Sequence, residues 1–159
     1  MSLNATDPQS HKGKTDVWLT PMWVIDALGP FDLDPCGEEH HKTAKTIYTN
    51  SGLDIPWFGK VWLNPPYSQA EKWVERLASH GNGVALIFNR MDTKMHQKYV
   101  RLADSVLFIE GRIPFLTKDL EKRGNPGCGS ILMSFGYVPD YSKIKGWSVE
   151  NKHDGIEIL

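Results

Sequence analysis

The sequence predicts an α/β fold built on a largely parallel sheet with helices on both faces. Apolar runs that read as strands alternate along the chain with segments whose apolar residues recur at helical spacing. Residues 83–89 are apolar almost throughout, which is typical of a strand buried on both faces of a parallel sheet. Asp34, Asn64 and Asn89 each follow such a run, at the strand ends where these sheets bind ligands. Strand-helix alternation of this kind also predicts right-handed crossovers.

The N-terminal region predicts an arm followed by a short helix. Residues 1–15 are polar and rich in small residues, so we expect a flexible arm, with residues 16–159 forming a single domain. At 159 residues the chain suits one α/β core. Thr20 as the N-cap, Pro21 at the first helical position and Gly29 as the stop predict the first helix.

The remaining elements follow from the same periodicities. Residues 31–34 alternate apolar and acidic positions before a proline, which predicts a strand that delivers a carboxylate at its end. The other predicted strands are 45–49, 61–64, 83–89, 105–110 and 130–135, and the other predicted helices are 69–79 and 93–103.

Charge and cysteine content narrow the protein class. The net charge of −1 excludes a global basic field, so any nucleic-acid contact depends on local patches. Cys36 and Cys128 are far apart, and the chain has no leader and no long apolar span. We therefore expect a soluble protein of a reducing, cytoplasmic compartment, with no membrane partner.

The most informative motif is Asn64-Pro65-Pro66-Tyr67, directly after residues 61–63. An exocyclic amino nitrogen attacks poorly because its lone pair is delocalised, and acceptors such as an Asn oxygen and a backbone carbonyl make it more nucleophilic by holding its hydrogens. The prolines fix two φ values and remove two N–H donors, and Tyr67 offers a flat face for stacking. These features predict a pocket for a flipped base. Alternatively, Asn-Pro after an apolar run only ends a strand.

With these residues, the chain resembles amino-group methyltransferases that use S-adenosylmethionine, most closely the phage-type, Dam-like DNA N6-adenine methyltransferases. The resemblance covers residues 16–136. It implies a Rossmann-like methyltransferase fold without a separate target-recognition domain, S-adenosylmethionine as cofactor and double-stranded DNA as partner. It also implies action in the bacterial host cytoplasm, and it leaves a monomer and a weak dimer both open.

The resemblance also implies a cofactor side. The segment Trp18-Leu19-Thr20-Pro21 looks like the family motif that lies against the methionine part of the cofactor. Asp34, followed by Pro35 and Cys36, is similar to the first-strand motif whose carboxylate faces the cofactor's amine and sulfonium. The alternative for Asp34 is a carboxylate that caps the following turn.

Two segments depart from the family pattern. Gly37-Glu38-Glu39 replaces a glycine-rich turn, and Ser51-Gly52-Leu53 stands where the family tends to have Asp-Gly-Leu. Asp54 is then our candidate for the contact to the cofactor adenine, with Trp57 or Phe58 packing on that ring or simply filling the core. Cys36, His40 and His41 lack the spacing of a zinc site, so we expect no metal.

On the DNA side, residues 117–127 are polar, glycine-rich and carry three cations, Lys118, Lys122 and Arg123. We expect this segment to read DNA, with Arg112 as a further contact, while Arg90 either contacts DNA or pairs with Asp92. Alternatively it is an ordinary surface loop.

The motif alone does not fix the acceptor, because similar Asn-Pro-Pro-Tyr segments act on an RNA base or a protein glutamine. A third alternative is a non-catalytic nucleic-acid-binding relative.

Overall fold

Seven strands form one mixed sheet in the computed structural model, which describes residues 17–124 and 126–152. The helices are α2 (Met22–Leu28), the 3-10 helix η1 (Tyr67–Gln69), α3 (Ala70–His80) and α4 (Lys94–Leu102). The strands are β1 (Leu33–Asp34), β2 (Thr46–Ile47), β3 (Val61–Leu63), β4 (Gly83–Phe88), β5 (Ser105–Ile109), β6 (Ser130–Phe135) and β7 (Gly146–Glu150). The predicted arm, residues 1–15, lies outside the described residues.

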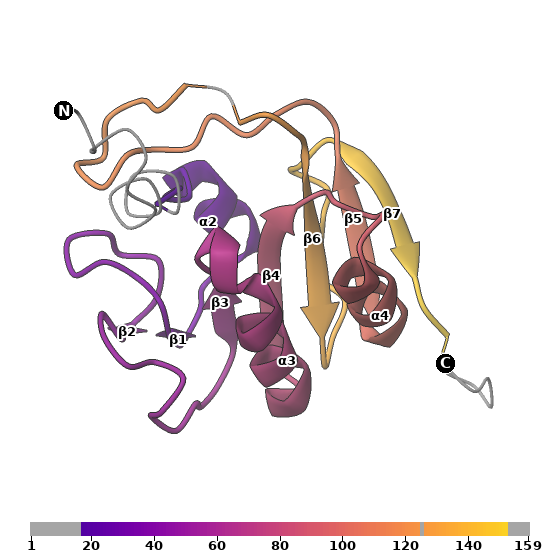
Figure 1. The fold of residues 1–159 in the computed structure, drawn as a ribbon, viewed down its shortest axis with the longest axis horizontal. Helices are drawn as coiled ribbons and strands as arrows, with labels where there is room; N and C mark the ends of the chain where they lie inside the picture. The colour runs from indigo at the N-terminus through magenta and orange to yellow at the C-terminus, as the bar shows by residue number, and fades with distance from the viewer. Residues whose placement is uncertain (1–16, 125, 153–159) are drawn as a thin grey trace, which may run out of the picture.

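The order of the strands in the sheet is β2-β1-β3-β4-β6-β5-β7. Strands β2, β1, β3 and β4 pair in parallel. The other three pairs, β4 with β6, β6 with β5 and β5 with β7, are antiparallel. Figure 1 shows β6 running opposite to its neighbours β4 and β5.

The predicted largely parallel sheet is therefore correct for one half of the sheet and wrong for the other. An apolar run shows that a strand is buried but carries no sign of its direction. β5 and β6 are joined by residues 110–129, in which there is no helix, and strands joined without a crossover helix usually pair antiparallel. Strand β7 was not predicted, because most of its residues are exposed at the sheet edge and show no apolar alternation.

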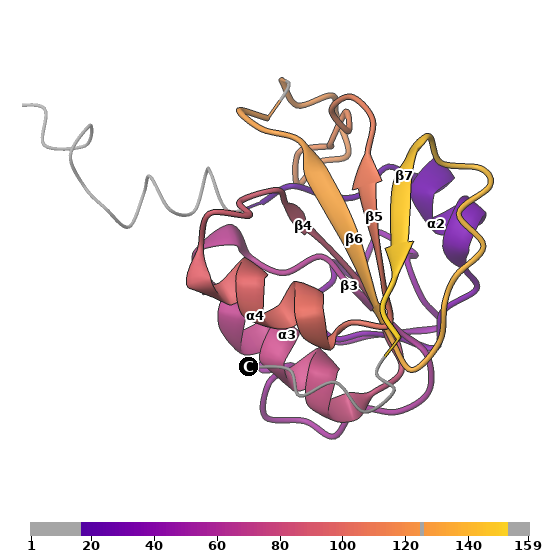
Figure 2. The ribbon, with the colours of Figure 1, turned by 90° about the vertical axis from the view of Figure 1, so that its right-hand side faces the viewer.

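Helices cover both faces of the sheet, as predicted. Figure 2 shows α3 and α4 on one side and α2 on the other. Successive β4 residues face opposite cores: Ala85 and Ile87 pack in the cluster with α3 and α4, whereas Val84 and Leu86 pack in the cluster with α2. This double burial is the physical reason for the continuous apolar run of β4.

The helix ends correct one prediction and confirm another. Helix α2 begins one residue later than predicted, with Pro21 as the N-cap and no side-chain cap, so Thr20 does not cap it. Gly29 ends α2, as expected. Helix α4 does have a side-chain cap, because the Thr93 Oγ1 accepts a hydrogen bond from the backbone N–H of His96.

The functional edge of the sheet is the one at which β1, β3 and β4 end. Because these strands are parallel, Asp34, Asn64 and Asn89 come to one edge, as the sequence predicted. The long connection between β5 and β6 lies at the same edge, where Figure 1 shows it in orange above β3 and β4. In the described part of the chain, no helix has the length and apolar character needed to span a bilayer.

Candidate active site

Asn64 follows β3 and is fixed through its amide nitrogen. The Nδ2 group donates to the backbone oxygen of Trp18 at 2.5 Å and to Oγ1 of Thr20 at 3.1 Å. The Trp18 carbonyl can only accept, so the amide orientation is determined and the Asn64 Oδ1 is the free end. Among the described residues, no group donates a hydrogen bond to this oxygen. The backbone oxygen of Asn64 accepts from Cys36 Sγ at 3.4 Å.

The N-terminal motif thus meets the Asn-Pro-Pro-Tyr motif, a contact that the sequence did not predict. Trp18 and Thr20 hold Asn64, and the fully buried Thr20 does so with the hydroxyl that the sequence suggested as a helix cap. Pro21, also buried, begins α2. This segment is positioned by an antiparallel bridge in which Leu19 and Leu116 exchange two backbone hydrogen bonds of 2.9 Å.

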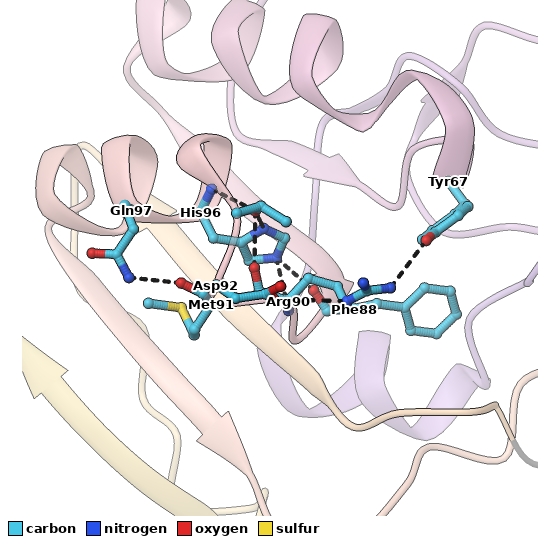
Figure 3. Close-up of polar contacts among 8 residues, drawn as sticks. Tyr67, Phe88, Arg90, Met91, Asp92, His96 and Gln97 are labelled. Carbon is cyan, nitrogen blue, oxygen red and sulfur yellow. Dashed lines mark hydrogen bonds and ion pairs between the residues drawn. The ribbon is translucent and has the colours of Figure 1, made fainter.

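Tyr67 is the exposed end of the motif. Pro65 is buried and Pro66 half-buried, whereas Tyr67 on η1 keeps 50% of its surface exposed. Its ring lies 5.7 Å from that of Phe88, and its hydroxyl accepts a hydrogen bond from Arg90 Nη1 at 3.3 Å. Figure 3 shows the Tyr67 and Arg90 side chains pointing toward each other from η1 and from the segment after β4.

An aromatic cleft opens between this motif and the β5–β6 connection. It has a volume of about 490 Å³ and is lined by Trp18, Tyr67, Phe88, Arg90, Gly127 and Cys128. Behind it lies a small cavity of about 30 Å³, which Asn64 and Pro65 line together with Trp18, Tyr67 and Phe88. The small cavity has room for about one water molecule. The two spaces share Trp18, Tyr67 and Phe88 as walls.

Asp34 ends β1 as a buried carboxylate that is 4% exposed. Thr43 Oγ1 and the Cys36 backbone N–H donate hydrogen bonds to it. Burial raises the pKa of Asp34 to about 6, against the opposing effect of these two hydrogen bonds, and Glu38 adds to the rise. No cation from the described residues pairs with this carboxylate. The alternative prediction is met in part, since Asp34 does accept from the turn that follows it.

The residues weighed as metal ligands have separate partners. Cys36 contacts the Asn64 carbonyl, His41 Nε2 lies 2.8 Å from the Thr20 carbonyl oxygen, and His40 Nε2 lies 2.7 Å from that of Lys118. Within the described ranges, no three His, Cys, Asp or Glu side chains gather as a metal site. The two histidines instead join the segment after β1 to the backbone at Thr20 and to the β5–β6 connection at Lys118.

The two departures from the family pattern lie beside Asp34. A Cβ added to Gly37 would stand 2.7 Å from Asp34 Oδ2. The backbone at residue 37 can therefore lie this close to the Asp34 carboxylate only because Gly37 has no side chain. A Cβ on Gly52 would stand 1.7 Å from the carbonyl oxygen of Pro35, which is buried, so the segment around Ser51 passes directly over the end of β1.

Within the described part of the chain, the predicted adenine contacts Asp54, Trp57 and Phe58 share no hydrogen bond with Asn64. Asp54 is exposed and, within the described part of the chain, shares no hydrogen bond with Asn64 or its partners. Trp57 stacks on Trp73 with ring centroids 6.3 Å apart, and its Nε1 donates to the Gly52 carbonyl. Trp57 therefore packs against the protein, whereas Phe58 is 47% exposed.

The predicted DNA-binding cations fall into two groups. Arg90, Arg112, Lys118 and Lys122 have exposed positions. Arg112 also fixes its loop by donating to the Pro126 carbonyl at 2.9 Å. Arg123 differs, because its guanidinium lies over the Trp18 ring at 3.7 Å instead of extending into solvent.

Sequence reasoning missed several residues of the site. Phe88 and Cys128 line the cleft, and Phe115 packs edge-on against Trp18. Strand ends and glycine-rich loops gave no sign of which aromatic side chains would meet.

His96 was also missed, although Thr93 three residues before it is a helix-cap signal that points to it. It is buried, and its ring nitrogens lie 2.7 Å from Thr93 Oγ1 and 2.6 Å from the Phe88 carbonyl oxygen (Figure 3). It therefore fixes the turn that carries Arg90. Burial lowers the pKa of His96, against the opposing effect of its bond to Phe88.

Comparisons with known proteins agree with this geometry. The family model described as DNA N-6-adenine-methyltransferase (Dam) matches residues 7–158. The chain belongs to this family. The "DNA N-6-adenine-methyltransferase" of Haemophilus phage HP1 is 33% identical over 155 residues, which are 88% of this chain and 90% of the relative.

A second relative, the "DNA N-6-adenine-methyltransferase" of Escherichia phage T1, is 34% identical over 132 residues. That match covers 76% of this chain and 53% of the relative, so the chain spans about half the length of the T1 protein. The predicted family and its DNA adenine methylation are confirmed by these matches, and such a reaction needs a methyl donor and a DNA substrate.

Proposed function

We propose that this protein is a site-specific methyltransferase that uses S-adenosylmethionine to methylate N6 of a flipped adenine in double-stranded DNA. Its bacteriophage relatives support action in the cytoplasm of a bacterial host. The sheet, with its ligand edge at the ends of β1, β3 and β4, then belongs to the Rossmann-like methyltransferase class.

One observation carries the proposal: the amide nitrogen of Asn64 is occupied, whereas none of the described residues donates to its oxygen. With Nδ2 donating to Trp18 and Thr20, Oδ1 is available to accept one N6–H of adenine. We assign the Pro65 carbonyl as the acceptor of the other hydrogen, since the Pro66 carbonyl already accepts from the backbone N–H of Gln69 at 3.0 Å. Two acceptors favour a pyramidal N6 with a localised lone pair. As N6 gains the methyl group its proton becomes acidic and leaves to water, so no general base is required.

The acceptor base enters through the aromatic cleft. Tyr67 is the stacking residue, and Phe88 forms the adjoining wall. Flipping a base out of a duplex costs a few kcal/mol, and stacking on an aromatic ring returns part of it. A shift of the half-exposed Tyr67 ring joins the cleft to the cavity at Asn64, so that the target base itself opens the last part of its path.

The cofactor side fits a cationic ligand. S-adenosylmethionine supplies an electrophilic methyl group next to a sulfonium and an amine. Asp34 is a buried carboxylate without a cation among the described residues, and an arriving positive charge would relieve its raised pKa. We place the methionine part near Asp34, Cys36 and Trp18, and we assign Asp54 to the adenine end of the cofactor. Because Gly37 and Thr43 cover Asp34, this contact needs residues 37–43 to shift.

DNA contacts come from the exposed cations at the same edge. Arg90 beside Tyr67 and Lys118 and Lys122 in the β5–β6 connection are the candidates for phosphate contacts, with Arg112 holding that connection in place. A few local cations, on a chain of net charge −1, imply modest and salt-sensitive affinity.

The test is direct detection of the product. Purified protein is incubated with S-adenosylmethionine and unmethylated duplex DNA, the DNA is digested, and N6-methyladenine is measured by mass spectrometry. Asn64→Ala should lose the product while keeping most cofactor affinity by calorimetry. Asn82→Ala is the matched control, because Asn82 precedes β4 at the opposite edge of the sheet and should retain wild-type activity.

The other outcomes contradict specific parts of the proposal. Cofactor binding without product on DNA would favour a different acceptor, such as an RNA base or a protein glutamine. Absence of cofactor binding would favour a non-catalytic relative. Full activity of Asn64→Ala would disprove the role of its amide.

A further inference from the structure

Arg123 is packed into the interior edge of the β5–β6 connection rather than presented to solvent. Its guanidinium carbon lies 3.7 Å from the centroid of the Trp18 ring, and Nη1 donates to the carbonyl oxygen of Val17. Its backbone N–H donates to the Phe115 carbonyl at 3.0 Å. No carboxylate among the described residues pairs with it. The side chain is therefore committed to residues 17 and 18.

The peptide groups of residues 17 and 18 link this arginine to Asn64. The Val17 carbonyl accepts from Arg123, and the next carbonyl, that of Trp18, accepts from Asn64 Nδ2 at 2.5 Å. On its other sides the Trp18 ring meets Phe88 and Phe115 edge-on, at 5.4 and 5.8 Å. The bridge between Leu19 and Leu116 holds the backbone next to the Trp18 carbonyl, and the aromatic edges and one guanidinium hold the Trp18 ring on the other side of it.

We propose that Arg123 is a positioning residue that acts through Trp18 to hold the Asn64 carboxamide in its active orientation. Through it, the β5–β6 connection, which carries the exposed Lys118 and Lys122, is mechanically joined to the reacting centre. DNA that engages this connection then acts on Asn64 through contacts of the protein itself. The proposal rests on the proposed function, because it assigns Asn64 the orienting role.

The chemistry of arginine explains why this position needs it. A guanidinium is planar and has five N–H donors, so it can stack on an indole and donate to a carbonyl at once. A lysine ammonium keeps the charge but is a compact point charge that cannot do both. A phosphate contact, in contrast, mainly needs the charge. Arg123→Lys therefore separates the two roles.

The first measurement is independent of activity. The side-chain amide signals of Asn64 are assigned in ¹⁵N spectra by their absence in Asn64→Ala, and their exchange with solvent is then measured in wild type and in Arg123→Lys. We expect exchange to be at least fivefold faster in Arg123→Lys and unchanged in Arg101→Lys, an exposed arginine of α4. Unchanged Asn64 signals and exchange in Arg123→Lys would overturn the proposal, whatever the activity.

The second measurement separates kcat from DNA affinity. Arg123→Lys should lower kcat at least tenfold, with the DNA Kd and the slope of log Kd against log salt near wild type. Lys122→Ala, in contrast, should weaken the DNA Kd and make the salt slope shallower. If Arg123→Lys kept full kcat, the inference would be wrong. Loss of all product in wild type would instead refute the proposed function, and the amide exchange would still decide the link itself.

Discussion

The side chain of Asn64 donates to the carbonyl oxygen of Trp18, 46 residues earlier in the chain, across 2.5 Å. This bond brings the Trp18–Pro21 motif and the Asn-Pro-Pro-Tyr motif into one unit. Among the described residues it also leaves Oδ1 without a donor, so this oxygen can serve as one of the two acceptors in the proposed reaction.

Thr20→Val tests the second bond that orients this amide. Valine has the shape of threonine but cannot accept from Nδ2, and one hydrogen bond of this kind contributes about 1 kcal/mol. We expect the single-turnover methylation rate to fall about fivefold, with cofactor affinity nearly unchanged. Thr49→Val, at an exposed position, is the control. A wild-type rate in Thr20→Val would show that the bond does not matter.

Tyr67 variants test base stacking. Removing an aromatic ring that stacks on a base costs about 1–3 kcal/mol, so Tyr67→Ala should weaken binding of a flipped base between about fivefold and 150-fold. Tyr67→Phe keeps the ring and loses only the bond from Arg90, so its affinity should stay within threefold of wild type, roughly the weight of one exposed hydrogen bond. Fluorescence of 2-aminopurine at the target position reports the flipping. Equal fluorescence in wild type and Tyr67→Ala would place the stacking contact elsewhere.

Asp34→Asn should raise the stability of the protein without ligands at neutral pH. The folded pKa of about 6 lies above the ordinary 3.8, so the native state binds more protons between these values, and wild type loses stability as pH rises through them. A shift of about two units corresponds to about 3 kcal/mol. We expect Asp34→Asn to exceed wild type by up to that amount at pH 7.5, with the gap closing below pH 4.

Urea unfolding at several pH values measures this difference, with Asp26→Asn on the exposed face of α2 as the control. The same variant should bind S-adenosylmethionine more weakly at pH 7.5. A gain in stability with unchanged cofactor affinity would separate the buried charge from the cofactor and contradict our placement of the amine and sulfonium.

His96 should give the opposite pH dependence. Its folded pKa is lowered by burial, so the unfolded chain binds more protons below about pH 6.5, and stability falls as the pH drops beneath that value. Burial also lowers the pKa of His41, which therefore contributes in the same direction. The measurement belongs in the Asp34→Asn background, where the opposing carboxylate is absent. There His96→Gln should flatten the decline between pH 6.5 and 5, and an unchanged slope would assign the effect to other groups.

Local patterns predicted most elements because their signals are local. Thr93 and Gly81 stand at the ends of α4 and α3, and the apolar run of β4 reflects burial on both faces. Strand direction had no such signal, so the antiparallel pairing of β6 went unpredicted, and the exposed edge strand β7 had none at all.

The candidate site likewise has residues that local sequence patterns predicted and residues that they did not. Asn64, Tyr67 and Asp34 were predicted from motif and order, because the proposed chemistry restricts their residue types, and their roles stay predictions. What Thr20 and Arg123 do was not predictable, since their partners lie 44 and 106 residues away in sequence, at Asn64 and Val17. A polar residue next to a helix start reads as a cap, and a cation in a loop reads as a DNA contact, until the fold shows which group each one faces.

The antiparallel placement of β5 beside β6 has an evolutionary consequence. Neighbouring antiparallel strands lie only about 4.8 Å apart and can be joined by a turn of a few residues. In this protein the connection between β5 and β6 consists of residues 110–129, which is far longer than such a turn. Because the described residues of this connection form no crossover helix, most of it can lengthen, shorten or change its residues without disturbing the sheet. Under the proposed function, we expect this part of the molecule to be where relatives acquire a new target sequence, with Leu116 and Arg123 kept as supports of Asn64.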